Sequence, residues 1–176
     1  MKQLLITAGG TAEKIDQVRS ITNHSTGQLG SLIAEAFLAH GYQVDYLTTH
    51  TALRPVNQDG LALHFIQDTK ELDETLTWLL QQKPYDAVIH SMAVSDFTPA
   101  NSFSLEALSY KINQELTKHS APFTKEDVAS LIEQTTAQET ATKISSDTDY
   151  LFLGLKKTPK VIKKIKEIQP NMILVS

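Results

Sequence analysis

The chain starts with a short apolar segment that ends in two glycines, and this start narrows the folds available to it. Residues 2–8 form a nearly continuous apolar run, which predicts a strand buried on both faces of a parallel sheet. Gly9 and Gly10 follow, where missing side chains permit a sharp turn and the close approach of a ligand. After an irregular stretch over residues 12–23, a helix is expected to open at residues 24–27, with Ser25 or Thr26 as its N-cap. A helix start beside such a turn can hold a phosphate, although glycines kept only for chain geometry would give the same pattern.

Strand and helix patterns alternate along most of the remaining chain. Apolar residues at helical spacing, including Leu29 and Leu32, predict a helix over residues 26–40 with one face inward, closed by a left-handed Gly41. Further strands are predicted at residues 43–48, 61–66, 87–90, 150–155 and 172–175, and further helices at 69–82 and 159–168. Alternation of this kind indicates right-handed βαβ units. We therefore expect a Rossmann-like α/β fold, a mostly parallel sheet with helices on both faces, in one domain spanning residues 1–176.

Residues 103–142 do not follow the alternating pattern. Two helices are predicted there, at residues 105–119 and 125–139, within charged and Ser/Thr-rich sequence. Thr124 and Asp127 have the spacing of a capping box at the start of the second helix. We interpret this segment as an insertion into the α/β domain that forms a flap or a dimer arm.

Composition and charge exclude several kinds of site and partner. The chain has no cysteine, which excludes disulfides, thiolate metal sites and cysteine nucleophiles. A net charge of −4 gives no overall attraction to nucleic acid. No apolar run approaches the roughly 18 residues of a membrane span, and the N-terminus does not have the pattern of a signal peptide. We therefore expect a cytoplasmic protein with neither a membrane nor nucleic acid as its partner.

A carboxylate follows the fourth predicted strand. Ligands of open α/β sheets lie beyond the carboxyl ends of the strands, which is where Asp96 is expected. A short carboxylate there could accept hydrogen bonds from the amino group of a base or from a ribose hydroxyl. It could equally cap an Asx-type turn, so both interpretations stay open.

The last predicted helix begins in a basic segment. Thr158 is expected as its N-cap and Pro159 as its first residue, an arrangement typical of helix starts. Lysines near a helix N-terminus oppose the helix dipole, so a bound polyanion would stabilise this arrangement. A solvated basic face is the alternative. The lysines concerned are Lys156, Lys157, Lys160 and Lys163.

Six short motifs occur in an order that is more specific than any one of them. Together they resemble the phosphopantothenate–cysteine ligase family, the amide-forming enzymes of coenzyme A biosynthesis, in a stand-alone bacterial form. The resemblance covers nearly the whole chain apart from residues 103–142. Family members continue past the position of Ser176, so a truncated C-terminus is one interpretation. The motifs are TAGGT at residues 7–11, IDQVR at 15–19, NHSTG at 23–27, AVSD at 93–96, KISS at 143–146 and TPK at 158–160.

The resemblance implies a two-step ligation. CTP would activate the carboxylate of 4′-phosphopantothenate as an acyl-cytidylate with release of pyrophosphate, and the amine of cysteine would then form the amide. Asn23 matches the asparagine that contacts the acyl-nucleotide, and Lys143 matches a loop lysine that contacts phosphates. Mg²⁺ as the metal and a homodimer as the assembly are implied as well. The remaining implied binding residues are Gly9, Gly10, Ser25, Thr26 and Gly27 at the first turn, Asp96 at the nucleotide, and Lys160, Val161, Ile162 and Lys163 at the phosphates.

Two other functions stay open from the sequence. A Rossmann-type NAD(P)-binding oxidoreductase normally carries G-x-G-x-x-G with an acidic residue about 20 positions later. Gly9 and Gly10 do not fit that pattern, and Asp45 stands too early in the second strand. A non-catalytic nucleotide-binding module would bind CTP without releasing pyrophosphate.

Overall fold

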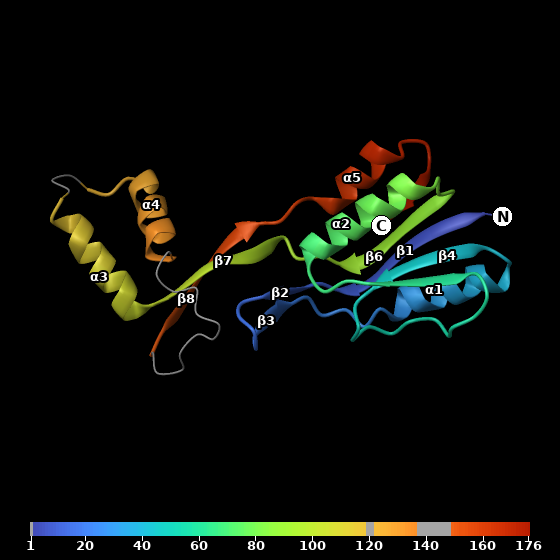
Figure 1. Cartoon of the computed structure of the whole chain (residues 1–176), viewed down its shortest axis with the longest axis horizontal. Coiled ribbons are helices and arrows are strands. Elements are labelled where there is room, and N and C mark those ends of the chain that lie inside the picture. Colours follow the sequence, from blue (N-terminus) through green and yellow to red (C-terminus); the bar gives the residue numbers. More distant parts are fainter. Residues whose placement is uncertain (1, 119–121, 137–148) are drawn as a thin grey trace. The chain divides into compact units, whose positions relative to one another are not determined.

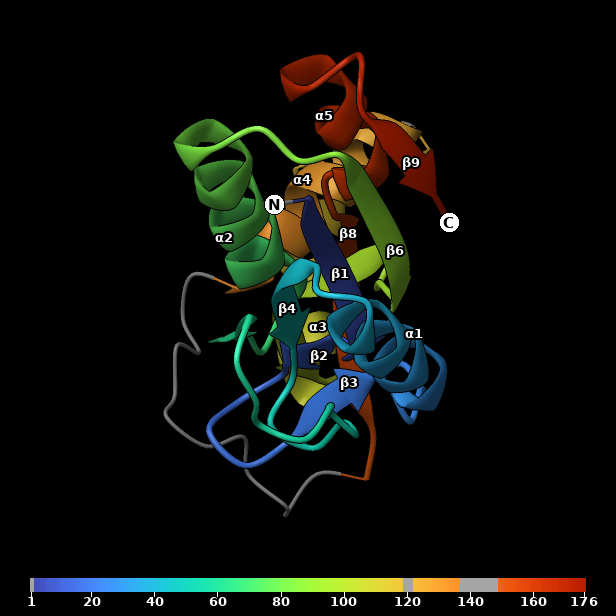
Figure 2. The same cartoon turned by 90° about the vertical axis from the view of Figure 1, so that its right-hand side faces the viewer.

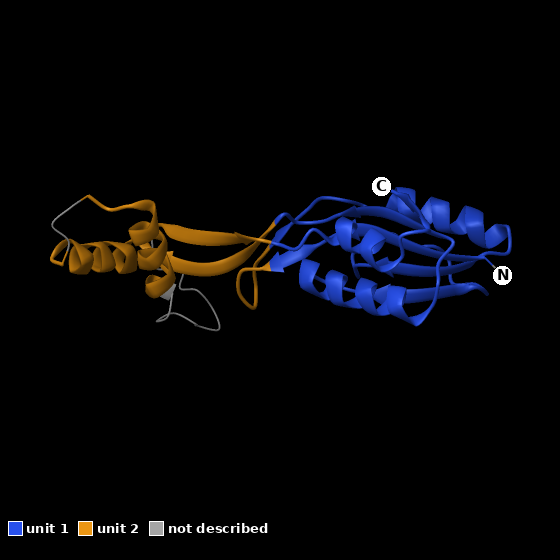
Figure 3. Cartoon of the chain, turned by 90° about the horizontal axis from the view of Figure 1, so that it is seen from above, with its two compact units in different colours: residues 1–13, 21–96, 158–176 blue, residues 14–20, 97–157 orange. Residues whose placement is uncertain are grey.

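The computed structural model describes residues 2–118, 122–136 and 149–176. The chain separates into two compact units, coloured in Figure 3. Unit 1 comprises residues 1–13, 21–96 and 158–176, and unit 2 comprises residues 14–20 and 97–157. The single domain expected from the sequence stays a prediction.

Unit 1 is built on a five-stranded sheet whose strands all run parallel (Figure 1). The strand order is β5-β4-β1-β6-β9. From β1 the chain continues to β4 and β5 on one side, and from β6 it continues to β9 on the other side. The carboxyl ends of β1 and β6 therefore meet at the point where ligands of open α/β sheets normally bind. This confirms the predicted Rossmann-like α/β fold. The strands are β1 (Gln3–Gly10), β4 (Gln43–Thr48), β5 (Leu61–Phe65), β6 (Ala87–Ala93) and β9 (Ile173–Val175).

Helices cover both faces of this sheet, as Figures 1 and 2 show. Helices α2 (Thr69–Gln82) and α5 (Val161–Ile168) pack over one face, where Leu72, Leu76 and Ile165 are fully buried with Leu5 and Leu47 of the sheet. Helix α1 (Gln28–Ala39) packs over the other face. The predicted arrangement with helices on both faces is confirmed.

The inward face of α1 differs from the prediction. Leu29 and Leu32, expected to face the sheet, are 64% and 57% exposed. The buried stripe instead consists of small residues with one leucine. A Cβ on Gly30 would come within 2.4 Å of the Ala8 Cβ on β1, so the missing side chain lets the helix backbone approach the strand closely. The buried residues of α1 are Gly30, Ser31, Ala34 and Leu38.

Two predicted helix starts are wrong. The N-cap of α1 is Gly27, with a φ of 75°, while the Thr26 hydroxyl accepts a bond from the Gln28 N–H at 3.3 Å. The N-cap of α5 is Lys160, because the Thr158 hydroxyl donates to the Ser95 carbonyl instead. Tertiary hydrogen bonding has replaced local capping at α5. Gly41, by contrast, has the expected left-handed conformation after α1, with a φ of 78°.

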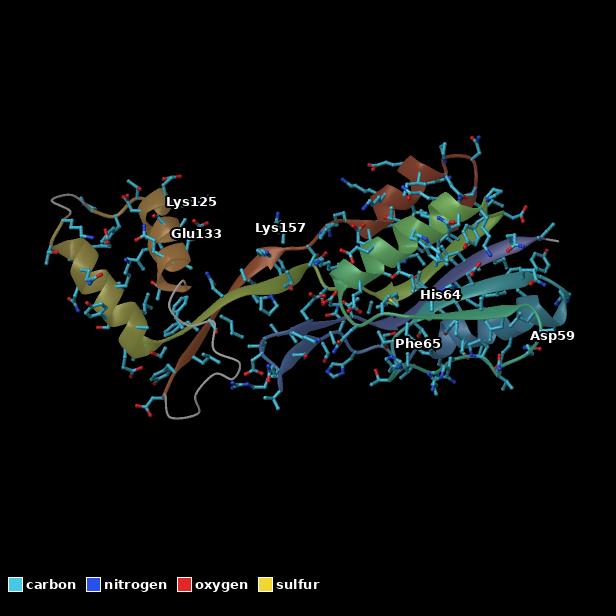
Figure 4. All side chains as sticks on the ribbon, viewed as in Figure 1. Asp59, His64, Phe65, Lys125, Glu133 and Lys157 are labelled. Carbon is cyan, nitrogen blue, oxygen red and sulfur yellow. The ribbon has the colours of Figure 1, made fainter. Side chains whose placement is uncertain are left out.

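Unit 2 contains a two-stranded antiparallel ribbon and two helices. The ribbon pairs β7 (Phe97–Ser104) with β8 (Leu151–Lys157), and β7 is a strand that the sequence does not predict. Its helices are α3 (Leu105–Leu116) and α4 (Lys125–Thr136). Figure 4 labels Lys125 and Glu133, which both lie on α4. Residues 119 and 137–139, the predicted ends of these helices, lie outside the described residues.

Two further local predictions concern the start of α4 and the stretch after β1. The predicted capping box before α4 is confirmed, since the Thr124 N–H donates to Asp127 at 2.8 Å and the Asp127 N–H donates to the Thr124 hydroxyl at 3.2 Å. The stretch expected to be irregular contains the short paired strands β2 (Ala12–Lys14) and β3 (Ser20–Thr22).

Candidate functional site

A cavity of about 610 Å³ opens in unit 1 beyond the carboxyl ends of β1, β4 and β5. Three of the predicted site residues line it, namely Gly10, Asn23 and Ser25. Because this edge of the sheet is where ligands of the fold normally bind, the cavity is the best candidate for a substrate pocket. Its other lining residues are Ala12, Thr22, His24, Thr49, His50, Thr51, Phe65, Ile66, Gln67 and Glu71.

Asn23 is held at the cavity wall by its backbone. Its N–H donates to the carbonyl of Thr11 at 3.2 Å, which ties it to the end of β1. A Cβ on Gly10 would lie 2.1 Å from the Asn23 carbonyl oxygen, so glycine is required at position 10 for this approach. The side chain of Asn23 is half-buried and reaches the cavity, where an amide can donate to a ligand oxygen.

The neighbouring glycines serve the chain itself rather than an open anion site. Gly9 has a φ of 99°, and a Cβ there would meet Ala52 Cβ at 2.8 Å. A Cβ on Gly27 would lie 3.0 Å from the same Ala52 atom and from the Leu53 carbonyl oxygen. At both positions the space beside the backbone is filled by the loop after β4. This geometry favours the structural interpretation of these two glycines.

Most residues of the cavity wall are not among those expected from the sequence, and His50, Phe65 and Glu71 make the contacts that matter most there. His50 stacks on Phe65, with ring centroids 4.4 Å apart and planes 4° from parallel, and the guanidinium of Arg54 lies 5.4 Å from the Phe65 centroid. Figure 4 labels Phe65. Glu71 accepts a bond from the Gln67 N–H at 2.8 Å. Only their position in the sequence could have indicated His50 and Phe65, because they stand at or just after the ends of predicted strands, as Asp96 does.

A second group of predicted residues lies where β6 ends and α5 begins. Lys160 Nζ lies 2.5 Å from Asp96 Oδ1, and both side chains are more than 60% exposed. The Thr158 N–H donates to the Asp96 carbonyl at 3.0 Å, which joins the start of α5 to the end of β6. Neither Asp96 nor Lys160 lines the cavity beside Asn23.

The predicted phosphate cradle at α5 is only partly available. The Val161 N–H is bonded to the Pro159 carbonyl at 3.1 Å, and the Lys163 N–H to the Lys160 carbonyl at 3.1 Å. The side chain of Val161 is buried in the core, whereas Ile162 is half-buried and Lys163 is exposed. The lysine side chains are therefore better placed than the backbone to contact an anion. Lys143 lies outside the described residues, so its role stays a prediction.

One buried carboxylate lies away from this edge of the sheet. Asp45, the third residue of β4, accepts bonds from His64 Nε2 at 2.8 Å, Tyr85 Oη at 2.9 Å and Lys83 Nζ at 2.6 Å. Burial alone would raise the pKa of Asp45, but the bonds from His64, Lys83 and Tyr85 outweigh burial and lower it. Burial, together with the charge and hydrogen bond of Asp45, raises the pKa of Tyr85.

The described residues hold neither a cluster of metal ligands nor a helix that could span a membrane. Residues 2–118, 122–136 and 149–176 contain no group of three or more histidine, aspartate or glutamate side chains placed to hold a metal ion. Within the same ranges, every helix is too short or too polar to span a bilayer.

Known proteins resemble the chain over most or all of its length. The family model for the DNA/pantothenate metabolism flavoprotein C-terminal domain matches residues 1–118. The coenzyme A biosynthesis bifunctional protein CoaBC of Thermococcus kodakarensis is 31% identical over 174 residues, which are 99% of this chain and 33% of that protein. The chain thus spans about a third of the length of this curated relative.

Solved structures give the same picture of the fold. The structure of the DNA/pantothenate metabolism flavoprotein from Streptococcus pneumoniae is 40% identical, with a TM-score of 0.78, and the match covers 99% of this chain and 68% of that chain. A Cab2 variant in complex with phosphopantothenate-cysteine is 20% identical, with a TM-score of 0.57, over 94% of this chain and 59% of that chain. The second likeness extends to the fold alone.

Proposed function

Because the chain belongs to the family of the DNA/pantothenate metabolism flavoprotein C-terminal domain, we propose that it ligates 4′-phosphopantothenate with cysteine in coenzyme A biosynthesis. The observation that carries this proposal is Asn23, held by Thr11 and Gly10 at the wall of a cavity beyond the sheet. The name of the Thermococcus kodakarensis relative supports the pathway. The cytoplasm is the proposed location.

The proposed reaction has two steps. A carboxylate oxygen of 4′-phosphopantothenate attacks the α-phosphorus of CTP, and the bond to pyrophosphate breaks. The cysteine amine then attacks the acyl carbon, loses a proton and displaces CMP. Since a free carboxylate is a poor acyl donor, the nucleotide supplies the leaving group, and the protein contributes mainly positioning and electrostatic stabilisation.

Asn23 is the proposed catalytic residue. Its amide N–H would donate to the acyl oxygen as negative charge develops there during attack by the amine. Removing one such donor typically lowers the rate by roughly 100- to 1,000-fold. The half-buried position of Asn23 suits this role, because a hydrogen bond to a developing charge strengthens where water is scarce.

Asp96, Lys160 and Lys143 form the proposed nucleotide end of the site. The exposed ion pair of Asp96 with Lys160 contributes only about 0–1 kcal/mol to stability, so nucleotide phosphates can draw Lys160 away at small cost. Asp96 would then accept a bond from the amino group of cytosine, while Lys143 and Lys163 add positive charge. An Mg²⁺ ion would be held mainly by phosphate oxygens and water, the coordination that this ion usually keeps.

A homodimer built through unit 2 is part of the proposal. Among its described residues, unit 2 buries few large apolar side chains, Phe103 and Leu131 being the fully enclosed ones. It exposes many more, and a two-stranded ribbon is marginal by itself, so a partner surface is expected. The exposed apolar residues of unit 2 include Phe97, Tyr110, Leu116, Val128, Tyr150 and Leu155.

The decisive test separates the three functions considered. The full-length protein should release pyrophosphate from CTP when 4′-phosphopantothenate and Mg²⁺ are present, and should form CMP and the amide only after cysteine is added. CTP binding without pyrophosphate release would indicate a non-catalytic module. The oxidoreductase is disfavoured, because Asp45 is buried in β4 and bonded to Tyr85 and Lys83 rather than placed at the carboxyl end of the strand.

A further inference from the structure

A continuous series of hydrogen bonds connects the two ends of the proposed site within unit 1. The Asn23 N–H donates to the Thr11 carbonyl at 3.2 Å, and the Ser95 N–H donates to the Thr11 hydroxyl at 2.9 Å. The Thr158 hydroxyl donates to the Ser95 carbonyl at 2.5 Å, and its N–H donates to the Asp96 carbonyl at 3.0 Å. Thr11 is the residue at which the bonds from Asn23 and from Ser95 meet.

Thr11 is fully buried, and each of its polar groups has a partner. Its N–H donates to the Ala93 carbonyl at 3.1 Å, and its hydroxyl proton points to Ser95 Oγ at 3.1 Å. Thr69 Oγ1 also lies 3.4 Å from the Thr11 hydroxyl, but its single proton is directed to Glu13 at the much shorter distance of 2.6 Å. The Thr11 hydroxyl therefore serves Ser95 as both donor and acceptor.

We propose that Thr11 is a positioning residue that sets the separation between Asn23 and the Ser95–Asp96 backbone, and thereby between the acyl group and the nucleotide. This inference rests on the proposed ligase function. Thr11 touches neither substrate in this scheme and acts through its two neighbours. Its hydroxyl joins Thr11, which follows β1, to Ser95, which follows β6 and stands 84 positions later in the chain, at the point where the strand order of the sheet reverses.

A nearby threonine provides a matched control. Thr48 on β4 is equally buried, and its hydroxyl donates to the Ala8 carbonyl at 2.9 Å. Thr48 thus also makes a buried side-chain bond to β1, but its bond leads to neither Asn23 nor Asp96. Thr11→Val and Thr48→Val remove one buried hydroxyl each at nearly constant volume, so Thr48→Val controls for the loss of a buried hydroxyl beside β1.

The expected result is a split between folding and catalysis. Thr11→Val should lower kcat for pyrophosphate release by roughly 10- to 100-fold, which is the scale for a small misplacement of reacting groups. Calorimetry should show that the variant is folded. Thr11→Ser, which keeps the hydroxyl, should retain most of the wild-type kcat. Thr48→Val should leave kcat within about threefold of wild type. If Thr11→Val does not fold, Thr158→Val, which removes the bond to the Ser95 carbonyl, should lower kcat in the same way.

A double-mutant cycle with Asn23→Ala excludes a merely structural role. If Thr11 acts by positioning Asn23, the fall in kcat caused by Asn23→Ala should be at least fivefold smaller in the Thr11→Val background than in wild type. Equal effects in both backgrounds, or a normal kcat in Thr11→Val, would overturn the inference while leaving an active wild type and the proposed function intact. A wild-type protein that releases no pyrophosphate would overturn the proposed function first and this inference with it.

Discussion

One missing side chain sets the position of the proposed catalytic residue. Gly10 and Asn23 approach so closely that a Cβ at position 10 would lie 2.1 Å from a backbone oxygen, which cannot swing away as a flexible side chain could. Gly10 therefore matters for where Asn23 lies rather than for direct contact with a phosphate. Gly10 of the TAGGT motif is informative about the site because its missing side chain permits Asn23 to reach the cavity.

Replacing Asn23 by aspartate is the sharpest test of its role. The change is nearly isosteric, so the fold should persist, but it exchanges an amide donor for a negatively charged acceptor. We expect the rate of acyl-cytidylate formation, or of its use by cysteine, to fall by roughly 100-fold or more. CTP affinity should be retained, whereas Lys143→Gln should weaken CTP affinity itself. Pyrophosphate release with and without cysteine, measured beside CTP binding, checks both; normal turnover in Asn23→Asp would disprove the assignment.

Asp96 is expected to determine the choice of nucleotide. CTP should raise the melting temperature of the wild-type protein more than ATP does, because a carboxylate can accept from the cytosine amino group. Asp96→Ala should abolish that difference. Asp73→Ala, which breaks the 2.7 Å ion pair with Lys164 elsewhere in unit 1, should lower stability but keep the preference for CTP. Thermal shifts at matched nucleotide concentrations give the answer, and equal shifts for CTP and ATP in wild type would argue against cytosine recognition.

At the scale of elements, the network around Asp45 joins β4 to the segment between α2 and β6. A buried carboxylate is costly unless it is fully hydrogen-bonded. Here Tyr85 and Lys83 from that segment, with His64 from β5, supply three donors. The folded state therefore favours the ionised form of Asp45.

This network predicts a specific pH dependence. Because the pKa of Asp45 is lowered below its ordinary 3.8 on folding, its contribution is complete above that value and is lost as the pH falls through the folded pKa. Tyr85→Phe removes one donor to a buried charge and should lower the free energy of unfolding by about 1.5–3 kcal/mol at pH 7. The loss should shrink below pH 3.8, as Asp45 becomes protonated in both states. Urea unfolding across this pH range is the measurement, with Tyr42→Phe as control; a loss that stays constant down to pH 2 would contradict the account.

Elements of the central sheet could be predicted from the sequence, whereas those of unit 2 could be predicted only in part. The strands β1, β4, β5, β6 and β9 are short and largely apolar, because a parallel sheet covered on both faces needs such residues. The strand β7 reads FTPANSFS, with a proline and several polar residues, so nothing in its local pattern indicates a strand. It forms because β8 pairs with it from more than 40 residues away, and no local pattern carries that information.

The candidate site was predictable to a similar extent. Asp96 is found because it follows a predicted strand, and Asn23 is found through the NHSTG motif, which stands just before the first predicted helix. His50 and Phe65 are different, because their significance comes from the stacking of a loop residue after β4 on the last residue of β5. Thr158 was misjudged for the same reason, since its hydroxyl bonds to distant Ser95 rather than to its own helix.

At the scale of the whole molecule, the connection between the units explains how the sheet accommodates a long insertion. The chain leaves unit 1 at Asp96 and returns at Thr158, and these two residues are hydrogen-bonded at 3.0 Å. An insertion whose ends meet in this way imposes no strain on β6 or α5, so its length is compatible with an undisturbed sheet.

The proposed dimer gives the last prediction. Leu155 on β8 is 45% exposed in unit 2, and Leu29 on α1 is 64% exposed in unit 1, so each presents apolar surface that a partner could cover. If unit 2 is the dimer arm, Leu155→Lys places a charge in the interface and should convert the protein to a monomer at micromolar concentration, because burying an unpaired charge costs several kcal/mol. Leu29→Lys should leave the dimer intact. Sedimentation velocity of both variants and wild type provides the measurement. A monomeric wild type would refute the dimer, whereas dissociation by Leu29→Lys alone would move the interface from the ribbon of unit 2 to α1.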